Sequence, residues 1–196
     1  MNDDPRLVDS VAELARRIVA RPIPQRSSCR IVAVDGPGGA GKSTLAGRLA
    51  AALGGIPVVP TDDFATWDEP LGWWPDFVES VLGPLASGAR VRYSSSAWPG
   101  RPPAVVEFGP CTLAIVEGVS SGRRDFAPFL SSLLWVEAPR PLRLARGLER
   151  DGADAAAQWQ SWIAAEDEYF AVHEPDRHAD FVVDGAADLP EEQVPD

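Results

Sequence analysis

Residues 36–44, GPGGAGKST, constrain this chain more than any other part of its sequence. They match the pattern G-x-x-x-x-G-K-[S/T] in full, follow an apolar strand-like run at 30–34 and precede a helix-like run at 45–53. Glycines let successive backbone N–H groups point at phosphate oxygens, and the positive end of the following helix strengthens that field. The segment therefore predicts a loop that binds a nucleoside triphosphate such as ATP.

Each residue type in the loop has a chemical reason to be there. Lys42 supplies a point charge for the β- and γ-phosphates, which makes it a catalytic candidate, and Ser43 offers a hydroxyl to Mg²⁺. A dinucleotide-binding loop is the alternative, because Asp62 follows at roughly the spacing of about 20 residues that such loops need. That alternative does not require Lys-Ser. The residues expected to contact the nucleotide are Gly36, Gly38, Gly39, Ala40, Gly41, Lys42, Ser43 and Thr44.

Strand-like and helix-like segments alternate along the chain. Short apolar runs typical of buried strands lie at 30–34, 56–59, 112–116, 133–136 and 181–183. Helical patterns lie at 6–20, 45–53, 75–86, 141–149 and 155–172. This alternation predicts an α/β fold of the P-loop NTPase class, a doubly wound parallel sheet with helices on both faces.

The chain is expected to divide into three parts. Residues 1–28 form a helix and a linker that pack on the core, and 29–185 form the P-loop domain. Within it, an irregular insertion at about 65–110, rich in Trp, Pro and Gly, holds short strands near 89–93 and 103–108 on the substrate side. Residues 186–196 form an acidic tail that is expected to be loose.

Acidic residues follow two of the predicted strands. In a doubly wound sheet, ligands bind beyond the carboxyl ends of the strands, where Asp62, Asp63 and Glu117 fall. Asp62 is the candidate general base for an acceptor hydroxyl, and Asp62 and Glu117 join Ser43 as candidate metal ligands. The ordinary alternatives are a helix cap for either aspartate and a solvated loop for Glu117. For Asp63 the cap is the favoured interpretation.

Arg143, Arg146 and Arg150 follow the strand-like run at 133–136. Their spacing of three and then four residues places them on one helix face. Arginines near a γ-phosphate would neutralise charge during transfer, so Arg146 and Arg150 are catalytic candidates in a lid that closes over the nucleotide. The alternative is a solvated face paired with Glu149 and Asp151.

Aromatic residues crowd the insertion. They could stack on a flat acceptor ring, or they could form a core under a long loop. Trp159, Trp162 and Tyr169 recur at helical spacing in the segment 155–172 and are expected in the core. The candidate substrate-binding residues are Trp74, Phe77, Tyr93 and Trp98.

The net charge of −11 argues against nucleic acid or an anionic membrane as a partner. No apolar run resembles a signal peptide or a membrane span, so the expected location is the cytoplasm. Cys29 and Cys111 adjoin strand-like runs, which predicts buried free thiols and no zinc site. The expected partner is a small-molecule acceptor, and a homo-oligomer remains compatible with the sequence.

Taken together, the motifs resemble the uridine kinase family of P-loop kinases, whose relatives act on phosphoribulose and pantothenate. The matching segments, in the family's order over about residues 29–185, are IVAVDGPGGAGKSTLA, TDDF, VLGPLASG followed by VRY, AIVEGV, RLARGLERDG and ADFVVDG. The resemblance implies a P-loop fold, ATP with Mg²⁺ as donor, and transfer to a primary hydroxyl. By motif, it makes Asp62 the base, Ser43 and Glu117 the metal side, Arg146 and Arg150 the lid residues, and Tyr93 a residue of the nucleoside pocket.

The chain departs from the nucleoside-specific members of that family. They carry a Tyr-Asp pair and a histidine five residues beyond the tyrosine, whereas this chain has Tyr93-Ser94 and Trp98. These departures count against uridine or cytidine as the acceptor but leave the kinase chemistry intact. A kinase for a nucleoside remains the leading hypothesis, and a kinase for a sugar, vitamin precursor or other alcohol is the alternative. Two further hypotheses are a nucleotide-binding switch without a small-molecule acceptor and a nucleotide binder that has lost catalysis. Lys42, Ser43 and Asp62 are all present, which gives the last hypothesis no support.

Overall fold

A computed structural model describes residues 5–98 and 100–192 of the chain. Five parallel strands form the central sheet in the order β2-β5-β1-β6-β7, and β3 and β4 form a separate antiparallel hairpin. The strands are β1 (Arg30–Asp35), β2 (Val58–Pro60), β3 (Val91–Ser94), β4 (Val105–Phe108), β5 (Leu113–Glu117), β6 (Leu130–Glu137) and β7 (Phe181–Asp184). The helices are α1 (Val11–Ala20), α2 (Lys42–Ala52), α3 (Trp74–Phe77), α4 (Gly83–Ser87), α5 (Arg140–Asp151), α6 (Ala156–His173) and α7 (Pro175–His178). Short helical turns are η1 (Thr61–Asp63), η2 (Val78–Leu82), η3 (Arg124–Phe126) and η4 (Ala153–Ala155).

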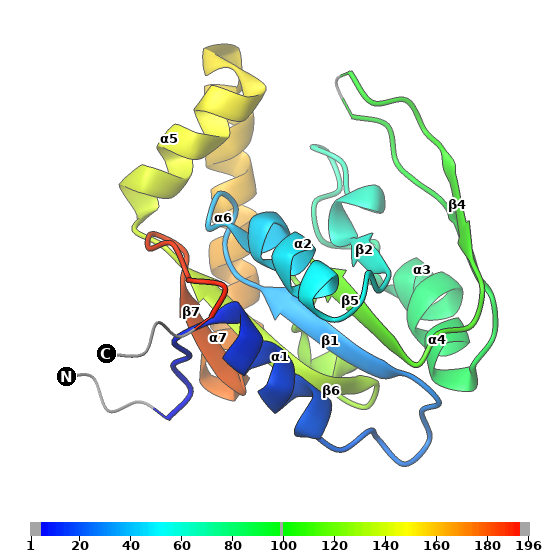
Figure 1. Cartoon of the computed structure of the whole chain (residues 1–196). Coiled ribbons are helices and arrows are strands. Elements are labelled where there is room, and N and C mark those ends of the chain that lie inside the picture. The colour runs from blue at the N-terminus through cyan, green and yellow to red at the C-terminus, as the bar shows by residue number, and fades with distance from the viewer. Residues whose placement is uncertain (1–4, 99, 193–196) are drawn as a thin grey trace.

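The side chains of each central strand alternate between two apolar cores. In β1, Val32 and Val34 face α1 and α2, whereas Ile31 and Ala33 face the segment α3–η2–α4 and helix α6. Because parallel strands are covered on both faces, their sequences are apolar throughout. The predicted fold class is confirmed: a parallel sheet with helices on both faces (Figure 1).

The helix-like and strand-like segments of the sequence all occur in the structure, with shifted ends. The N-terminal helix begins at Val11 and not at residue 6, because the Ser10 side chain caps it by accepting from the Glu13 N–H, and Leu7 forms a β-bridge with Val182 instead. The helix predicted at 75–86 is a continuous run of α3, the π-helical η2 and α4. Its irregular turn precedes Pro84, which has no N–H to give to a regular ladder.

The acidic tail is held in place as far as it is described. The N–H groups of Val11 and Ala12 donate to the carbonyls of Pro190 and Glu191, and Arg48 on α2 pairs with Asp188 and Glu191. The prediction of a loose tail is wrong for these residues. The first-turn N–H groups of α1 and the Arg48 side chain of α2 thus donate to the carbonyls and carboxylates of the acidic segment.

The two cysteines lie at the amino ends of adjacent strands. Cys29 is buried and Cys111 is half-buried, both are free thiols, and their sulfur atoms are 3.9 Å apart. Burial raises the pKa of Cys29 to about 12, so it is an unreactive thiol at neutral pH.

Two segments extend beyond the same side of the sheet. Figure 1 shows α5 rising with α6 on one flank and the β3–β4 hairpin rising on the other. The phosphate loop between β1 and α2 lies at the carboxyl end of the central strand. In the described part of the chain, no helix combines the length and apolarity that a membrane crossing needs.

Candidate active site

The loop at residues 36–41 runs from the end of β1 to the start of α2. Gly39 and Gly41 have φ values of +76° and +102°, a region that other residues rarely adopt, and Gly41 immediately precedes the first turn of α2. A Cβ at Gly39 would lie 2.3 Å from the carbonyl oxygen of Arg143. The curl of the loop therefore requires glycine at both positions, and close contact with α5 requires it at Gly39 as well.

A buried carboxylate that the sequence analysis did not single out fixes the start of the loop. Asp35 is fully buried and accepts from the N–H groups of Gly36 (2.7 Å), Ser120 (3.1 Å) and Gly122 (2.9 Å), and from the Tyr169 hydroxyl (2.6 Å). Burial raises its pKa, and these bonds, together with the charge of Lys42, partly offset that rise. The one signal in the sequence is an acidic residue directly after the apolar run 31–34.

Lys42, Ser43 and Glu117 meet at the carboxyl ends of β1 and β5. Lys42 is 7 % exposed and its Nζ donates to the Pro37 carbonyl at 2.9 Å. The Ser43 side chain lies close enough to the Glu117 carboxylate to lower its pKa. Burial raises the pKa of Glu117, and the negative charge of Asp62 raises it further, while Lys42 and Ser43 lower it. Asp62 and Glu117 therefore lie close enough to repel each other, as two carboxylates that share a cation would.

Neutralising Glu117 should stabilise the protein without nucleotide. A raised folded-state pKa means that the buried carboxyl favours its protonated form. The free-energy cost of the buried negative charge is therefore absent below the ordinary pKa of 4.5, and it is fully present once the pH has risen through the folded-state pKa. Glu117→Gln should raise the melting temperature by about 2–4 °C at pH 8 and much less at pH 5. Thermal unfolding at both pH values measures this, with Glu149→Gln on the exposed face of α5 as the control. An equal effect of Glu117→Gln at both pH values would contradict the argument.

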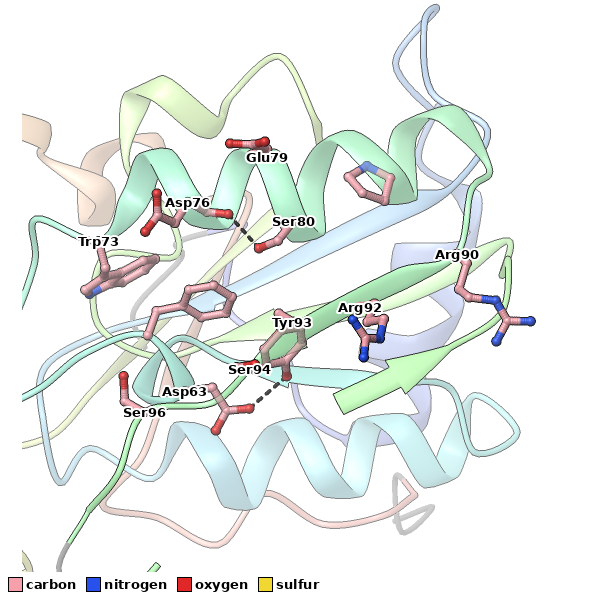
Figure 2. Close-up of a pocket in the computed structure, with 12 residues that line it drawn as sticks. Asp63, Trp73, Asp76, Glu79, Ser80, Arg90, Arg92, Tyr93, Ser94 and Ser96 are labelled. Carbon is pink, nitrogen blue, oxygen red and sulfur yellow. Dashed lines mark hydrogen bonds between the residues drawn. The ribbon is translucent and has the colours of Figure 1, made fainter. Parts of the chain in front are cut away.

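The two aspartates after β2 have different surroundings. Asp62 is half-buried, and its backbone carbonyl accepts from Trp98 Nε1 at 2.7 Å. The side chain of Asp63 is buried and accepts from the Tyr93 hydroxyl at 2.7 Å (Figure 2). It also accepts from Arg101 Nη1 at 2.8 Å. The interpretation of Asp63 as a helix cap is wrong, because its carboxylate bonds to the β3–β4 hairpin and not to a helix N–H. Burial and the bond to Asp63 raise the pKa of Tyr93.

A pocket of about 560 Å³ opens between the β3–β4 hairpin and the segment α3–η2–α4 (Figure 2). Its walls combine aromatic faces, serine side chains and charges of both signs. Its lining residues are Asp63, Phe64, Trp73, Asp76, Glu79, Ser80, Pro84, Arg90, Arg92, Tyr93, Ser94 and Ser96.

Of the four aromatic residues predicted to bind substrate, Tyr93 lines this pocket. Phe77 is fully buried and stacks on Phe126, because it supplies the apolar face by which α3 packs on the sheet. Trp74 lies against the guanidinium of Arg123 at 4.9 Å. Trp98 packs on two other tryptophans outside the lining. The structure thus does not bring Phe77, Trp74 or Trp98 to the pocket, which sequence spacing alone could not reveal.

The three arginines of α5 reach different partners. Arg143 Nε donates to the Ala138 carbonyl at 3.0 Å, and Arg146 donates to the carbonyls of Gly185 (2.9 Å) and Gly39 (3.3 Å). Arg146 thereby holds its charge beside the phosphate loop. Arg143, Arg146 and Arg150 therefore do not form a single cluster of positive charges, although all three lie on α5.

Arg150 forms two bonds to Asp151, at 2.7 and 2.8 Å, as the alternative interpretation of a paired helix face requires. The hydrogen bonding to Asp151 is the main cause that raises the pKa of Arg150, and the negative charges of Asp62 and Glu117 raise it further. Arg150 therefore also lies within electrostatic reach of the two candidate site carboxylates, so pairing with Asp151 does not remove it from the site.

Glu166 on α6 is a second buried carboxylate that sequence reasoning missed. Its Oε1 accepts from the Gly38 N–H and from Trp162 Nε1, each at 2.7 Å, and its Oε2 is 3.7 Å from Arg143. Burial raises its pKa, and these partners and Lys42 lower it. The helical spacing of Trp159, Trp162 and Tyr169 indicated a core helix and concealed a polar contact with the phosphate loop.

No protein-family model matches the chain, and no curated protein sequence matches it. Several solved structures have similar folds, and three of them are each aligned over most of both chains. A protein provisionally assigned as a fructose transport system kinase, from Silicibacter sp. TM1040, is 25 % identical over 89 % of this chain and 98 % of its own, with a TM-score of 0.73. A protein provisionally assigned as a uridine kinase, from Bacillus stearothermophilus, is 19 % identical over 89 % and 97 % (TM-score 0.65). D-glycerate 3-kinase from Cryptococcus neoformans var. grubii is 14 % identical over 91 % and 94 % (TM-score 0.55).

The chain has a P-loop kinase fold. The residues present in this kinase fold also fit a nucleotide with Mg²⁺. Three loop glycines, Gly36, Gly39 and Gly41, have positive φ, and the loop opens onto the N-terminus of α2, where oxyanions bind well. Within residues 5–98 and 100–192, no group of three or more His, Cys, Asp or Glu residues could hold a metal on its own. Two carboxylates and a serine suit Mg²⁺, which is usually held by one or two carboxylates together with phosphate oxygens.

Proposed function

We propose that this protein is an ATP- and Mg²⁺-dependent kinase that transfers the γ-phosphate to a hydroxyl group of a small molecule. One observation carries the proposal: Lys42, the Ser43–Glu117 pair and Asp62 converge at the carboxyl ends of adjacent parallel strands, next to a phosphate loop. Ligands of doubly wound sheets bind at that edge. The kinases with similar folds support the same reaction class.

Bound ATP with Mg²⁺ would supply the phosphoryl group and the metal charge. In the proposal, the Lys42 ammonium turns from the Pro37 carbonyl to the phosphates. Ser43, Glu117 and Asp62 would hold Mg²⁺. Asp62 accepts the proton of the acceptor hydroxyl as that oxygen attacks. Arg146 and Arg150 add positive charge from α5.

The pocket beside Asp63 is the proposed acceptor site. Serine side chains, carboxylates and the Arg90–Arg92 pair surround it, and the faces of Phe64 and Trp73 give it an apolar side. Groups of this kind suit a polyhydroxylated acceptor, either a free sugar or the ribose of a nucleoside. The similar structures include proteins assigned to fructose and to uridine, which supports testing both classes.

An ADP-release assay with ATP and Mg²⁺ tests the proposed function. The panel consists of ketoses and aldoses including fructose, the common nucleosides, glycerate and hydroxylated vitamin precursors. We expect at least one compound to raise ADP release by about tenfold or more over the acceptor-free rate. The product should carry one new phosphate group by mass spectrometry. Slow ADP release that no acceptor stimulates, but that another protein does, would favour a nucleotide-binding switch instead.

A further inference from the structure

Glu166 has an unusual environment for an acidic side chain. It is 1 % exposed, and a single oxygen, Oε1, accepts both the Gly38 N–H and Trp162 Nε1. Burying a carboxylate costs free energy unless charged or hydrogen-bonded partners offset the cost. Arg143 at 3.7 Å and the charge of Lys42 provide part of that compensation. An apolar side chain would fill the same space without this cost, so the polar contact calls for an explanation.

Gly38 has no side chain, which allows this close contact. A Cβ at Gly38 would lie 2.9 Å from Glu166 Oε1 and 3.0 Å from the Trp159 ring. Both neighbours belong to α6, so a side chain at position 38 would be crowded by this helix. The carboxylate therefore fixes the direction of one N–H group in the middle of the phosphate loop.

The anchoring of α6 to the sheet does not depend on this bond. Tyr169, one turn further along the same face, donates to Asp35 at 2.6 Å, and Trp162 and Tyr169 belong to the apolar core. What Glu166 contributes separately is the connection to Gly38. Its role is thus to set the shape of the loop rather than to hold the helix.

The same carboxylate is connected to the acceptor side. The Trp162 ring meets those of Trp67 and Trp98 edge to face, with centroids 5.6 and 6.1 Å apart. Trp98, from the β3–β4 hairpin, donates to the carbonyl of Asp62. A continuous path of contacts therefore runs from Asp62 through Trp98, Trp162 and Glu166 to Gly38.

We propose that Glu166 is a positioning residue: by accepting the Gly38 N–H it fixes the course of the phosphate loop, so that the other N–H groups of the loop are held ready for the nucleotide, and through Trp162 and Trp98 it ties the loop to the residue proposed as the base. The inference rests on the proposed function, since it assumes that the loop binds ATP. It makes Glu166 matter for nucleotide affinity, although Glu166 lies 128 residues after Gly38 in the sequence.

Calorimetric titration of the full chain with a non-hydrolysable ATP analogue and Mg²⁺ tests the inference. Glu166→Ala should weaken binding by about tenfold or more, because the Gly38 N–H loses its buried acceptor. Glu166→Gln should stay within about threefold of wild type, because its amide oxygen can still accept both bonds. Glu168→Gln, at an exposed position of the same helix, is the matched control and should bind as wild type does.

Trp162→Phe provides a second variant in case Glu166→Ala does not fold. It keeps an aromatic ring in the core but removes one of the two donors to Glu166, so binding should weaken by about threefold. Wild-type affinity in a folded Glu166→Ala protein, with only a lowered melting temperature, would overturn the inference, as would wild-type affinity in Trp162→Phe. Equal weakening in the Gln and Ala variants would overturn it too, since charge rather than the hydrogen bond would then decide. Failure of the wild-type protein to bind the analogue would instead refute the proposed function itself.

Discussion

Replacing Asp62 with asparagine should lower acceptor-dependent ADP release by about 10²–10⁴-fold while ATP affinity stays within a few-fold of wild type. An amide of the same shape cannot take the proton of the attacking hydroxyl. The backbone carbonyl that Trp98 binds is unchanged, so the β3–β4 hairpin should keep its place. The loss is therefore expected in kcat, measured by ADP release at saturating ATP and acceptor.

The matched control is Asp68→Asn, an exposed aspartate on the loop that follows. It should leave ADP release unchanged. Because Asp62 is also a candidate metal ligand, Mg²⁺ should be varied in the same assay. A rate that high Mg²⁺ restores would assign Asp62 to the metal and not to the proton, and a rate near that of wild type at ordinary Mg²⁺ would remove it from both roles.

The architecture could be predicted from the sequence because each signal is local and repeated. Apolar runs followed by helical patterns specify a parallel sheet, and the GPGGAGKS segment specifies how its first strand meets the following helix. Ends of elements were less predictable. Leu7 has the spacing of a helical residue but bridges to Val182, a partner 175 positions away that no local pattern reveals.

The hydrogen-bond partners of the buried carboxylates around the loop could not be predicted from the sequence. Asp35 and Glu166 are both buried and both bond to loop N–H groups, yet one ends an apolar strand and the other sits among core tryptophans. Each bond joins segments that are distant in sequence or depends on which way a backbone N–H points. Asp63 illustrates the same limit, since its partners Tyr93 and Arg101 come from a hairpin about 30 and 38 residues on. Only the folded chain brings them together.

The candidate site residues have different surroundings in the structure. Lys42, Ser43 and Asp62 each lie close enough to Glu117 to change the pKa of its carboxyl. Phe77, in contrast, is an interior residue. Aromatic side chains in an irregular segment serve the core as readily as a ligand, so composition does not separate the two uses.

Replacing Lys42 with methionine should abolish most of the activity, lowering turnover by about 10²–10³-fold and weakening ATP binding as well. Methionine is an unbranched side chain only one atom shorter than lysine, but it removes the only charge within residues 36–44. Arginine should restore little, since a planar guanidinium does not fit where a buried ammonium bonds to the Pro37 carbonyl. Arg16→Met, at an exposed position of α1, is the control and should leave both quantities unchanged.

Lys42 is the only lysine in the sequence, which allows a direct test of its position relative to the nucleotide. An acyl-phosphate derivative of ATP transfers its acyl group to an amine beside the bound phosphates. Mass spectrometry should find the label on Lys42, and excess ATP with Mg²⁺ should prevent it, because both compounds would occupy the same loop. Labelling of the N-terminal amine alone, or labelling of Lys42 that ATP does not prevent, would show that this ammonium does not face the phosphates, and the loss of turnover in Lys42→Met would then need another cause.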